Sequence, residues 1–162
     1  LITGANSGIG FYAALALASA GADVIMAGRN EDKIRTAIKI IEKENISGTI
    51  ESEIVNLADL KSVRSFAESV KKKHTRLDIL INNAGVMMTP ELKTEDGFEL
   101  QFGVNFLGHF ALTGLLYEML NTTMNSRVVT LSSIAHRGAT IDFNNLKIEK
   151  PYDAKREYYQ SK

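Results

Sequence analysis

A tyrosine and a lysine stand four residues apart near the end of the chain, in Tyr158-Tyr-Gln-Ser-Lys162. On a helix, side chains at i and i+4 lie on one face, so the phenol and the ammonium become neighbours. A free phenol ionises only at about pH 10, whereas an adjacent ammonium favours the phenolate. Tyr158 can then exchange a proton with a carbonyl oxygen while hydride moves at the adjacent carbon. Such pairs are also common on solvated helices, so this one needs support from other groups.

Two serines supply a first supporting group. Ser132 and Ser133 follow an apolar stretch at 127–131 that has strand character, so their hydroxyls lie at a strand end. A hydroxyl there can hydrogen-bond the same carbonyl oxygen. The nearby histidines have simpler roles: we expect His136 to be a hydrogen-bonding loop residue and His109 to be structural within an apolar helix.

The first ten residues indicate which kind of ligand takes part in this chemistry. Three glycines separate an apolar pair at 1–2 from an apolar-rich stretch at 11–20, an order that predicts a strand, a tight turn and a helix. Glycine permits positive φ and a close approach of ligand to backbone, and a helix N-terminus attracts phosphate. An ordinary glycine-rich loop is the alternative. The residues expected to contact a dinucleotide are Gly4, Asn6, Ser7, Gly8, Ile9 and Gly10.

Strand-like and helix-like segments alternate along the whole chain. Strands are expected at 1–2, 23–27, 49–55, 78–81 and 127–131. Helices are expected at 8–20, buried on nearly all faces, at 31–41, at 60–70 with Asp59 as its cap, and at 95–121, with a last helical turn after a long connection at 132–155. This alternation predicts an α/β fold with a doubly wound parallel sheet, the Rossmann fold, covered by helices on both faces. Residues 1–162 are expected to form a single domain.

The second strand indicates which cofactor is held. In a dinucleotide fold, an acid at its end binds the ribose 2′-hydroxyl of NAD, but this chain has Gly28 and Arg29 there. A guanidinium can bind a 2′-phosphate through two hydrogen bonds, so NADP(H) is favoured over NAD(H); the alternative is an exposed arginine without a role. Asn30 is expected beside it, both at the cofactor and as a helix cap. Asn56 and Leu57, after the third strand, are placed against adenine.

The fourth strand runs into Asn82-Asn-Ala-Gly85 at the same edge of the sheet. Two consecutive asparagines often fix a turn through side-chain bonds to the backbone. We expect Asn82 to tie strands together, and Asn83, Ala84 and Gly85 to line the cofactor.

Composition excludes other classes of function. The chain has 19 basic and 19 acidic residues and no cysteine, with 44% hydrophobic residues. We therefore expect no nucleic-acid partner and no thiolate metal site, and the three histidines lack metal-ligand spacing. No apolar run is long enough for a membrane segment, so the cytoplasm is the expected location. The chain starts inside a strand and stops inside a helix, so we expect a truncated domain without its C-terminal substrate-covering part and leave an N-terminal anchor open.

Taken together, the motifs resemble those of short-chain dehydrogenases/reductases. They are Thr3-Gly-x-x-x-Gly-Ile-Gly10, Asn82-Asn-Ala-Gly85, Asn105, Ser133 and Tyr158-x-x-x-Lys162. The glycine spacing is that family's, and the resemblance covers the whole chain. The sequences of residues 3–10, 104–110 and 132–136 resemble those of the retinol dehydrogenase and WW-domain oxidoreductase-like branch of this family.

The resemblance implies a catalytic tetrad of Asn105, Ser133, Tyr158 and Lys162. Tyr158 would be the acid in carbonyl reduction, Ser133 would orient the carbonyl, and Lys162 would favour the phenolate and hold the nicotinamide ribose. Asn105 would position a water that links Lys162 to solvent. One departure is Asn56, where many members carry aspartate; an amide can still accept from the adenine amino group.

The implied activity is NADP-dependent hydride transfer to or from a small carbonyl or alcohol substrate that is apolar, such as a retinal-like molecule, a ketone or an aldehyde. Its pocket is expected to use Ile134, His136, Phe143, Leu146, Ile148, Met87 and Met88. The helix at 95–121 is apolar over a wide arc, and in the family this helix packs against a second subunit, so a homodimer or homotetramer is expected.

Two other functions are alternatives to this activity. One is a non-catalytic dinucleotide-binding scaffold or redox sensor, which the intact tetrad disfavours. The other is a nucleotide-sugar epimerase, which the glycine spacing disfavours.

Overall fold

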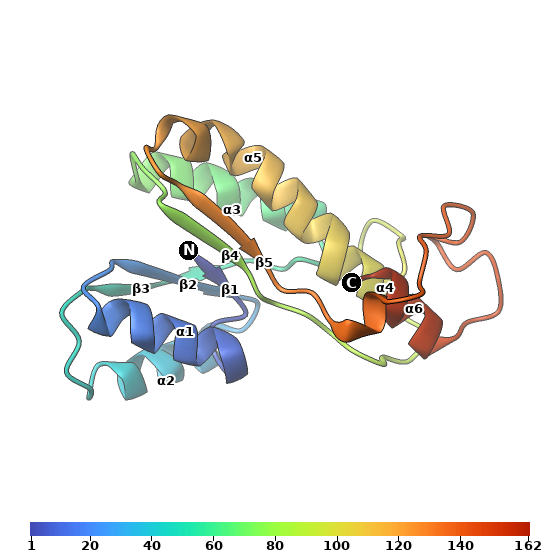
Figure 1. Ribbon diagram of the computed structural model, residues 1–162, viewed down its shortest axis with the longest axis horizontal. Coiled ribbons are helices and arrows are strands. Elements are labelled where there is room, and N and C mark those ends of the chain that lie inside the picture. The colour runs from blue at the N-terminus through green and yellow to red at the C-terminus, as the bar shows by residue number, and fades with distance from the viewer.

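Five parallel strands form the sheet of the computed structural model, which describes all residues 1–162. This sheet lies at the centre of the protein (Figure 1). The order of its strands is β3-β2-β1-β4-β5, with every neighbouring pair parallel. The strands are β1 (Ile2–Thr3), β2 (Val24–Gly28), β3 (Ile50–Ile54), β4 (Ile79–Asn82) and β5 (Arg127–Thr130). The expected doubly wound α/β fold is confirmed.

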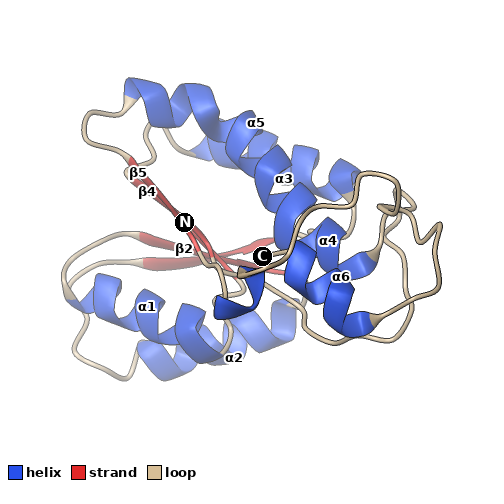
Figure 2. Cartoon of the chain, turned by 45° about the vertical axis from the view of Figure 1, so that its right-hand side comes forward, coloured by secondary structure: helices blue, strands red, loops and turns tan.

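Helices cover the two faces of this sheet as separate layers. α1 (Gly8–Ser19) and α2 (Glu31–Ile41) lie on one face, and α3 (Leu60–Lys73) and α5 (Gly108–Thr122) on the other (Figures 1 and 2). A short α4 (Leu100–Phe102) and a π-helical segment, η1 (Gly103–Leu107), lead into α5. The 3₁₀ turn η2 (Ile134–His136) and α6 (Ala154–Gln160) lie beyond the carboxyl end of β5.

The helix starts follow the polar residues that precede them. The Asn30 side chain accepts from the Lys33 N–H at 2.9 Å and caps α2, and Asp59 accepts from the Lys61 N–H at 2.9 Å and caps α3. Both caps match the sequence expectation, because a side-chain oxygen satisfies an N–H that the first helical turn leaves unpaired. α1 differs: Ser7 precedes it in an extended conformation but makes no capping hydrogen bond.

The core has one apolar cluster on each face of the sheet. The larger joins α3 and α5 to the sheet, and the smaller joins α1 and α2 to it. All five residues of β2 are buried, whereas all four of β5 are exposed, with Val128 and Val129 each 45% exposed. Helical cover is therefore complete over the centre of the sheet and incomplete along the β5 edge. None of the helices combines the length and the apolar character that a membrane crossing requires.

Two sequence expectations about helices are wrong in detail. The helix expected from Glu95 begins at Leu100, because 94–98 form a turn in which the Phe98 N–H donates to Thr94 Oγ1 and Gly97 has a φ of 82°. Glu99 then caps the helix through the Phe102 N–H at 2.7 Å. α1 was expected to be buried nearly all round, yet it buries one stripe of small residues and leaves Tyr12 69% exposed.

The α3–α5 cluster supplies a stability prediction. Leu116 is fully buried in it, so Leu116→Ala removes apolar contacts and leaves a cavity. We expect the free energy of unfolding to fall by about 2–5 kcal/mol, measured by urea denaturation of the full-length protein. Leu92→Ala is the control, because Leu92 is 50% exposed; an equal loss in both variants would contradict the assignment of Leu116 to the core.

Candidate active site

The carboxyl ends of the strands surround a cavity of about 580 Å³, a volume suited to a small-molecule site. The sequence-predicted residues that line it are Gly4, Asn6, Ser7, Ile9, Arg29, Asn30, Asn56, Leu57, Asn83, Ala84, Gly85, Tyr158 and Lys162. The cavity is also lined by residues that were not predicted from the sequence to belong to it, namely Thr3, Gly28, Lys33, Val55, Val86, Val104 and Leu131. Gly8, Gly10, Asn105 and Ser133 are outside the lining.

The glycine turn is shaped by both positive φ and close packing. Gly4 and Gly8 have φ values of 66° and 56°, which glycine adopts without strain. A Cβ on Gly10 would lie 2.6 Å from the Gly4 carbonyl oxygen and 2.5 Å from Asn83 Nδ2. Gly10 is therefore required by the packing of the turn against Asn83, although it does not face the cavity itself.

The N-terminus of α1 is suited to an anion. Its first-turn N–H groups have no side-chain cap and its first turn carries no acidic residue, in contrast to α2, whose start is capped by Asn30 and carries Glu31 and Asp32. Asn6, Ser7 and Ile9 border the cavity at this point. Unpaired N–H groups and the positive end of the helix dipole together favour a phosphate. The observed turn therefore fits the pyrophosphate of a dinucleotide.

Two cations stand at one end of the cavity. Arg29 follows β2, and Lys33 lies in the first turn of α2; both are exposed and neither forms an ion pair within the chain. Lys33 was missed by the sequence reasoning, although its spacing offered a signal, since it follows Arg29 by four residues at a capped helix start. The Asn30 side-chain oxygen is already used by that cap.

The hydroxyl of Thr3 joins three segments behind the cavity. Thr3 is fully buried, and its Oγ1 accepts from the N–H groups of Asn83 and Ala84 at 2.9 and 3.0 Å. The same oxygen lies 2.8 Å from Nε2 of His109, whose Nδ1 lies 3.0 Å from the Asn105 carbonyl oxygen. Burial lowers the pKa of His109 to about 4, so the ring is neutral near pH 7 and donates from Nδ1 while Nε2 accepts from Thr3. The structural role expected for His109 is thereby defined.

The two asparagines after β4 have different partners. Asn82 Nδ2 donates to the hydroxyls of Thr113 in α5 and Thr130 in β5, at 3.0 and 3.3 Å, so it ties neighbouring elements together as expected. Asn83 Nδ2 donates to the Thr3 carbonyl oxygen at 2.7 Å and so holds the glycine turn while the residue lines the cavity. Asn56, farther along the cavity, uses its side-chain oxygen to accept from the Ala58 N–H at 3.1 Å.

Asn105 lies in the π-helical segment η1, an irregularity that is frequent at functional sites. Its Oδ1 accepts from the Val86 N–H at 2.8 Å, and its Nδ2 donates to the Val86 carbonyl oxygen at 2.9 Å and to Ser161 Oγ at 2.8 Å. Ser161 is the residue before Lys162, so the Asn105 amide connects the helix leading into α5 with the catalytic candidates of α6.

Lys162 is half-buried at the other end of the cavity from Arg29. Its Nζ donates to the Leu131 carbonyl oxygen at 3.3 Å and lies 3.5 Å from the position of a Cβ on Gly85. Burial lowers the pKa of this ammonium. α6 itself ends at Gln160, and Ser132 Oγ holds the chain beyond it by donating to the Lys162 carbonyl oxygen at 2.9 Å.

The remaining residues predicted to take part in catalysis or substrate binding were expected at the Lys162 end of the cavity. Ser133 caps η2, its Oγ accepting from the Ala135 N–H at 3.2 Å, which leaves the hydroxyl proton available to another acceptor. His136 contacts the Ser133 carbonyl oxygen through Nδ1, in agreement with the expected loop role. Of the residues expected to line a substrate pocket, only Met87 borders the cavity; Ile134 and Phe143 are 76% and 77% exposed. The connection at 134–152 therefore contributes less to this cavity than its position in the sequence suggested.

Comparison with known proteins identifies the class to which this fold and cavity belong. The family model described as short chain dehydrogenase matches residues 1–144. The chain therefore belongs to the short-chain dehydrogenase family.

Its curated relatives place it near the retinol dehydrogenases. It is 50% identical to retinol dehydrogenase 13 of Mus musculus over 163 residues, covering 100% of this chain and 49% of the relative. It is 41% identical to polyprenol dehydrogenase of Homo sapiens over 166 residues, covering 100% of this chain and 50% of the relative. The chain thus spans about half the length of the curated relatives it matches.

Solved structures share the fold of this chain. An uncharacterized protein from Mycobacterium paratuberculosis shares 45% identity and a TM-score of 0.86, over 99% of this chain and 55% of that one. A short chain dehydrogenase from Shigella flexneri, complexed with NADP, shares 25% identity and a TM-score of 0.77, over 99% of this chain and 64% of that one.

The packing of the glycine turn generates a binding prediction. Gly10→Ala places a methyl group against Gly4 and Asn83, so the turn must shift. We expect dinucleotide affinity of the full-length protein, measured by fluorescence titration, to fall by about tenfold or more, since a shift near 1 Å strongly disturbs a positioned site. Gly114→Ala is the matched control, because its added Cβ meets nothing within 4 Å. Unchanged affinity in Gly10→Ala would show that the turn does not position the ligand.

Proposed function

We propose that this protein is an NADP-dependent oxidoreductase that transfers hydride between a nicotinamide cofactor and a carbonyl or alcohol substrate, with Tyr158 as the proton donor or acceptor. The observation that carries the proposal is a single cavity with two unlike ends. One end has the uncapped α1 N-terminus and two cations, and the other has Tyr158 and the half-buried Lys162. Family membership supports oxidoreduction as the chemistry that uses both ends.

The preference for NADP(H) rests on Arg29 and Lys33. Both border the cavity at the end of β2, no acidic residue lines the cavity, and neither cation is neutralised within the chain. A 2′-phosphate would gain charge-assisted hydrogen bonds there, whereas a 2′-hydroxyl has no carboxylate partner. The NADP complex of the Shigella flexneri relative supports the same choice.

The two cations provide a direct test of cofactor choice. We expect Arg29→Ala and Lys33→Ala each to weaken NADPH binding by about tenfold, with NADH binding nearly unchanged, because each removes a charge-assisted contact to the 2′-phosphate alone. Fluorescence titration of the full-length variants measures both affinities. Arg64→Ala, an exposed change on α3 outside the cavity, is the control. Equal affinity of the unaltered protein for NADH and NADPH would refute the preference.

The proposed mechanism assigns one task to each residue at the chemical end. When bound, the nicotinamide supplies or accepts the hydride. Tyr158 gives its hydroxyl proton to the carbonyl oxygen in reduction and takes it back in oxidation, while the Ser133 hydroxyl orients that oxygen. Lys162 would hold the nicotinamide ribose hydroxyls through its ammonium group. Asn105 keeps Ser161, and hence the Lys162 backbone, in place.

Removal of the Tyr158 hydroxyl distinguishes between an enzyme and a non-catalytic scaffold. We expect Tyr158→Phe to reduce carbonyl turnover to background while NADPH affinity changes by less than about threefold, because the lost hydroxyl acts in proton transfer. Stopped-flow and steady-state assays of the full-length protein measure the two quantities. Tyr159→Phe, the same change one residue along, should leave turnover intact. Turnover retained by Tyr158→Phe would remove the proposed role, and no turnover in the unaltered protein would favour a scaffold or redox sensor.

The substrate and assembly are proposed on the same basis. Val86, Met87, Val104 and Leu131 give the chemical end of the cavity an apolar wall, which supports an apolar carbonyl or alcohol. The relatives named retinol dehydrogenase and polyprenol dehydrogenase point the same way. A homodimer or homotetramer through η1 and α5 is supported by their exposed aromatic side chains, namely Phe106 in η1 and Phe110 and Tyr117 in α5.

A further inference from the structure

The helix that carries Tyr158 is anchored by polar side chains. α6 has seven residues, and the two that it buries are Glu157 and Gln160, which are 0% and 7% exposed. With 3.6 residues per turn, these two share one face of the helix and Tyr158 points away from it, while Lys162 follows just after the helix ends. The orientation of the proposed proton donor therefore depends on how Glu157 and Gln160 are held.

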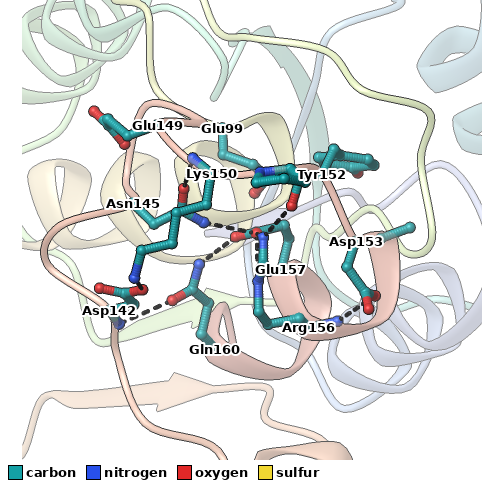
Figure 3. A network of polar contacts seen from close by, with 12 residues as sticks. Glu99, Asp142, Asn145, Glu149, Lys150, Tyr152, Asp153, Arg156, Glu157 and Gln160 are labelled. Atoms are coloured by element: carbon teal, nitrogen blue, oxygen red, sulfur yellow. Dashed lines mark hydrogen bonds and ion pairs between the residues drawn. The ribbon is translucent and has the colours of Figure 1, made fainter.

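Glu157 accepts hydrogen bonds on both carboxylate oxygens. Oε1 accepts from Asn145 Nδ2 at 3.0 Å and from Arg156 Nε at 2.9 Å, and Oε2 accepts from Gln160 Nε2 (Figure 3). Asn145 is itself fully buried, so the contact takes place away from solvent. A buried carboxylate is retained at low cost only where it is paired in this way.

Two backbone N–H groups fix the direction of this network. The Lys150 N–H donates to Asn145 Oδ1 at 2.8 Å, and the Asp142 N–H donates to Gln160 Oε1 at 3.0 Å. Neither side-chain amide can rotate by 180° without turning its NH₂ group toward a backbone donor. Both amides therefore present donors to position 157. Glu157 satisfies them because both of its side-chain oxygens accept.

The loop at 142–150 is also attached to the segment that leads into α5. The Glu99 N–H donates to the Leu146 carbonyl oxygen at 2.8 Å, and Glu99 caps α4, which continues into the π-helical segment that contains Asn105. Glu99 is fully buried and its Oε1 has no hydrogen-bond partner; burial raises the pKa of this carboxyl, and the charge of Glu157 adds to that effect. Glu157, by contrast, accepts hydrogen bonds from three side chains.

We propose that Glu157 is a positioning residue: paired with Gln160, it sets the rotation of α6 and so the placement of Tyr158 and Lys162, and it locks the 142–150 loop to that helix. The inference rests on the proposed function, since its consequence is a change in the proposed proton transfer. Glu157 is not part of the cavity lining, and neither are its side-chain partners Asn145, Arg156 and Gln160, so it acts through the helix that bears Tyr158.

The test uses a reciprocal exchange of the two side chains in the full-length protein. Glu157→Gln places an NH₂ group against a donor, and Gln160→Glu places two carboxylates together, so each single variant breaks the pattern. The double variant Glu157→Gln/Gln160→Glu restores it, because Glu at 160 accepts from the Asp142 N–H and from Gln at 157, whose oxygen accepts from Asn145. Each single variant should lose about tenfold or more in kcat, a loss typical of a misplaced catalytic group. The double variant should return to within about threefold of the unaltered enzyme.

The accompanying measurements distinguish positioning from general damage. NADPH affinity should stay within about twofold in all variants, because the phosphate end of the cavity is built by other elements. Glu149→Gln, an exposed change of the same type in the same loop, should leave kcat unchanged. Retention of kcat in Glu157→Gln, or no recovery in the double variant, would overturn the proposal, and recovery holds as evidence even if a single variant fails to fold. If Tyr158→Phe keeps its turnover, the proposed function fails; if it loses turnover while Glu157→Gln does not, only this inference fails.

Discussion

The site depends on one buried hydroxyl. Thr3 belongs to a strand of two residues, yet its Oγ1 accepts from the two N–H groups that follow β4 and bonds the neutral ring of His109. Through His109 the same connection reaches the carbonyl oxygen of Asn105. Loss of this hydroxyl would leave buried N–H groups without an acceptor, a cost of about 1–3 kcal/mol per group. The glycine turn, the loop after β4 and the π-helical segment are held in register by it.

The two ends of the cavity are built in different ways. The phosphate end uses backbone: a glycine turn with positive φ, the uncapped first turn of α1 and a short approach between Gly10 and Asn83. The chemical end uses side chains on α6, a short helix fixed from outside by Asn105 and by the buried face of Glu157. A backbone cradle tolerates changes in side chains, whereas a side-chain site depends on directional hydrogen bonds. Small shifts are therefore expected to affect catalysis before cofactor binding.

Local signals in the sequence predicted much of the fold. The helix caps at Asn30 and Asp59, the alternation of strands and helices, and the role of Asn82 all follow from residue types and their spacing. The start of the helix leading to α5 was predicted too early, because a turn closed by Thr94 competes with helix formation over those residues. The exposure of β5 and of one side of α1 depends on which elements pack there, so composition alone did not give it.

The sequence by itself determined the parallel α/β fold, the dinucleotide-type turn and the residues at the strand ends, because backbone conformation and hydrophobic periodicity are properties of short segments. Tertiary structure alone decided that Lys33 shares the cavity with Arg29, that His109 is neutral and bonded to Thr3, and that Glu157 is buried and paired. These properties belong to contacts between residues that are far apart in the chain. Burial and hydrogen-bond partners set protonation and orientation, and neither can be read from spacing along the sequence.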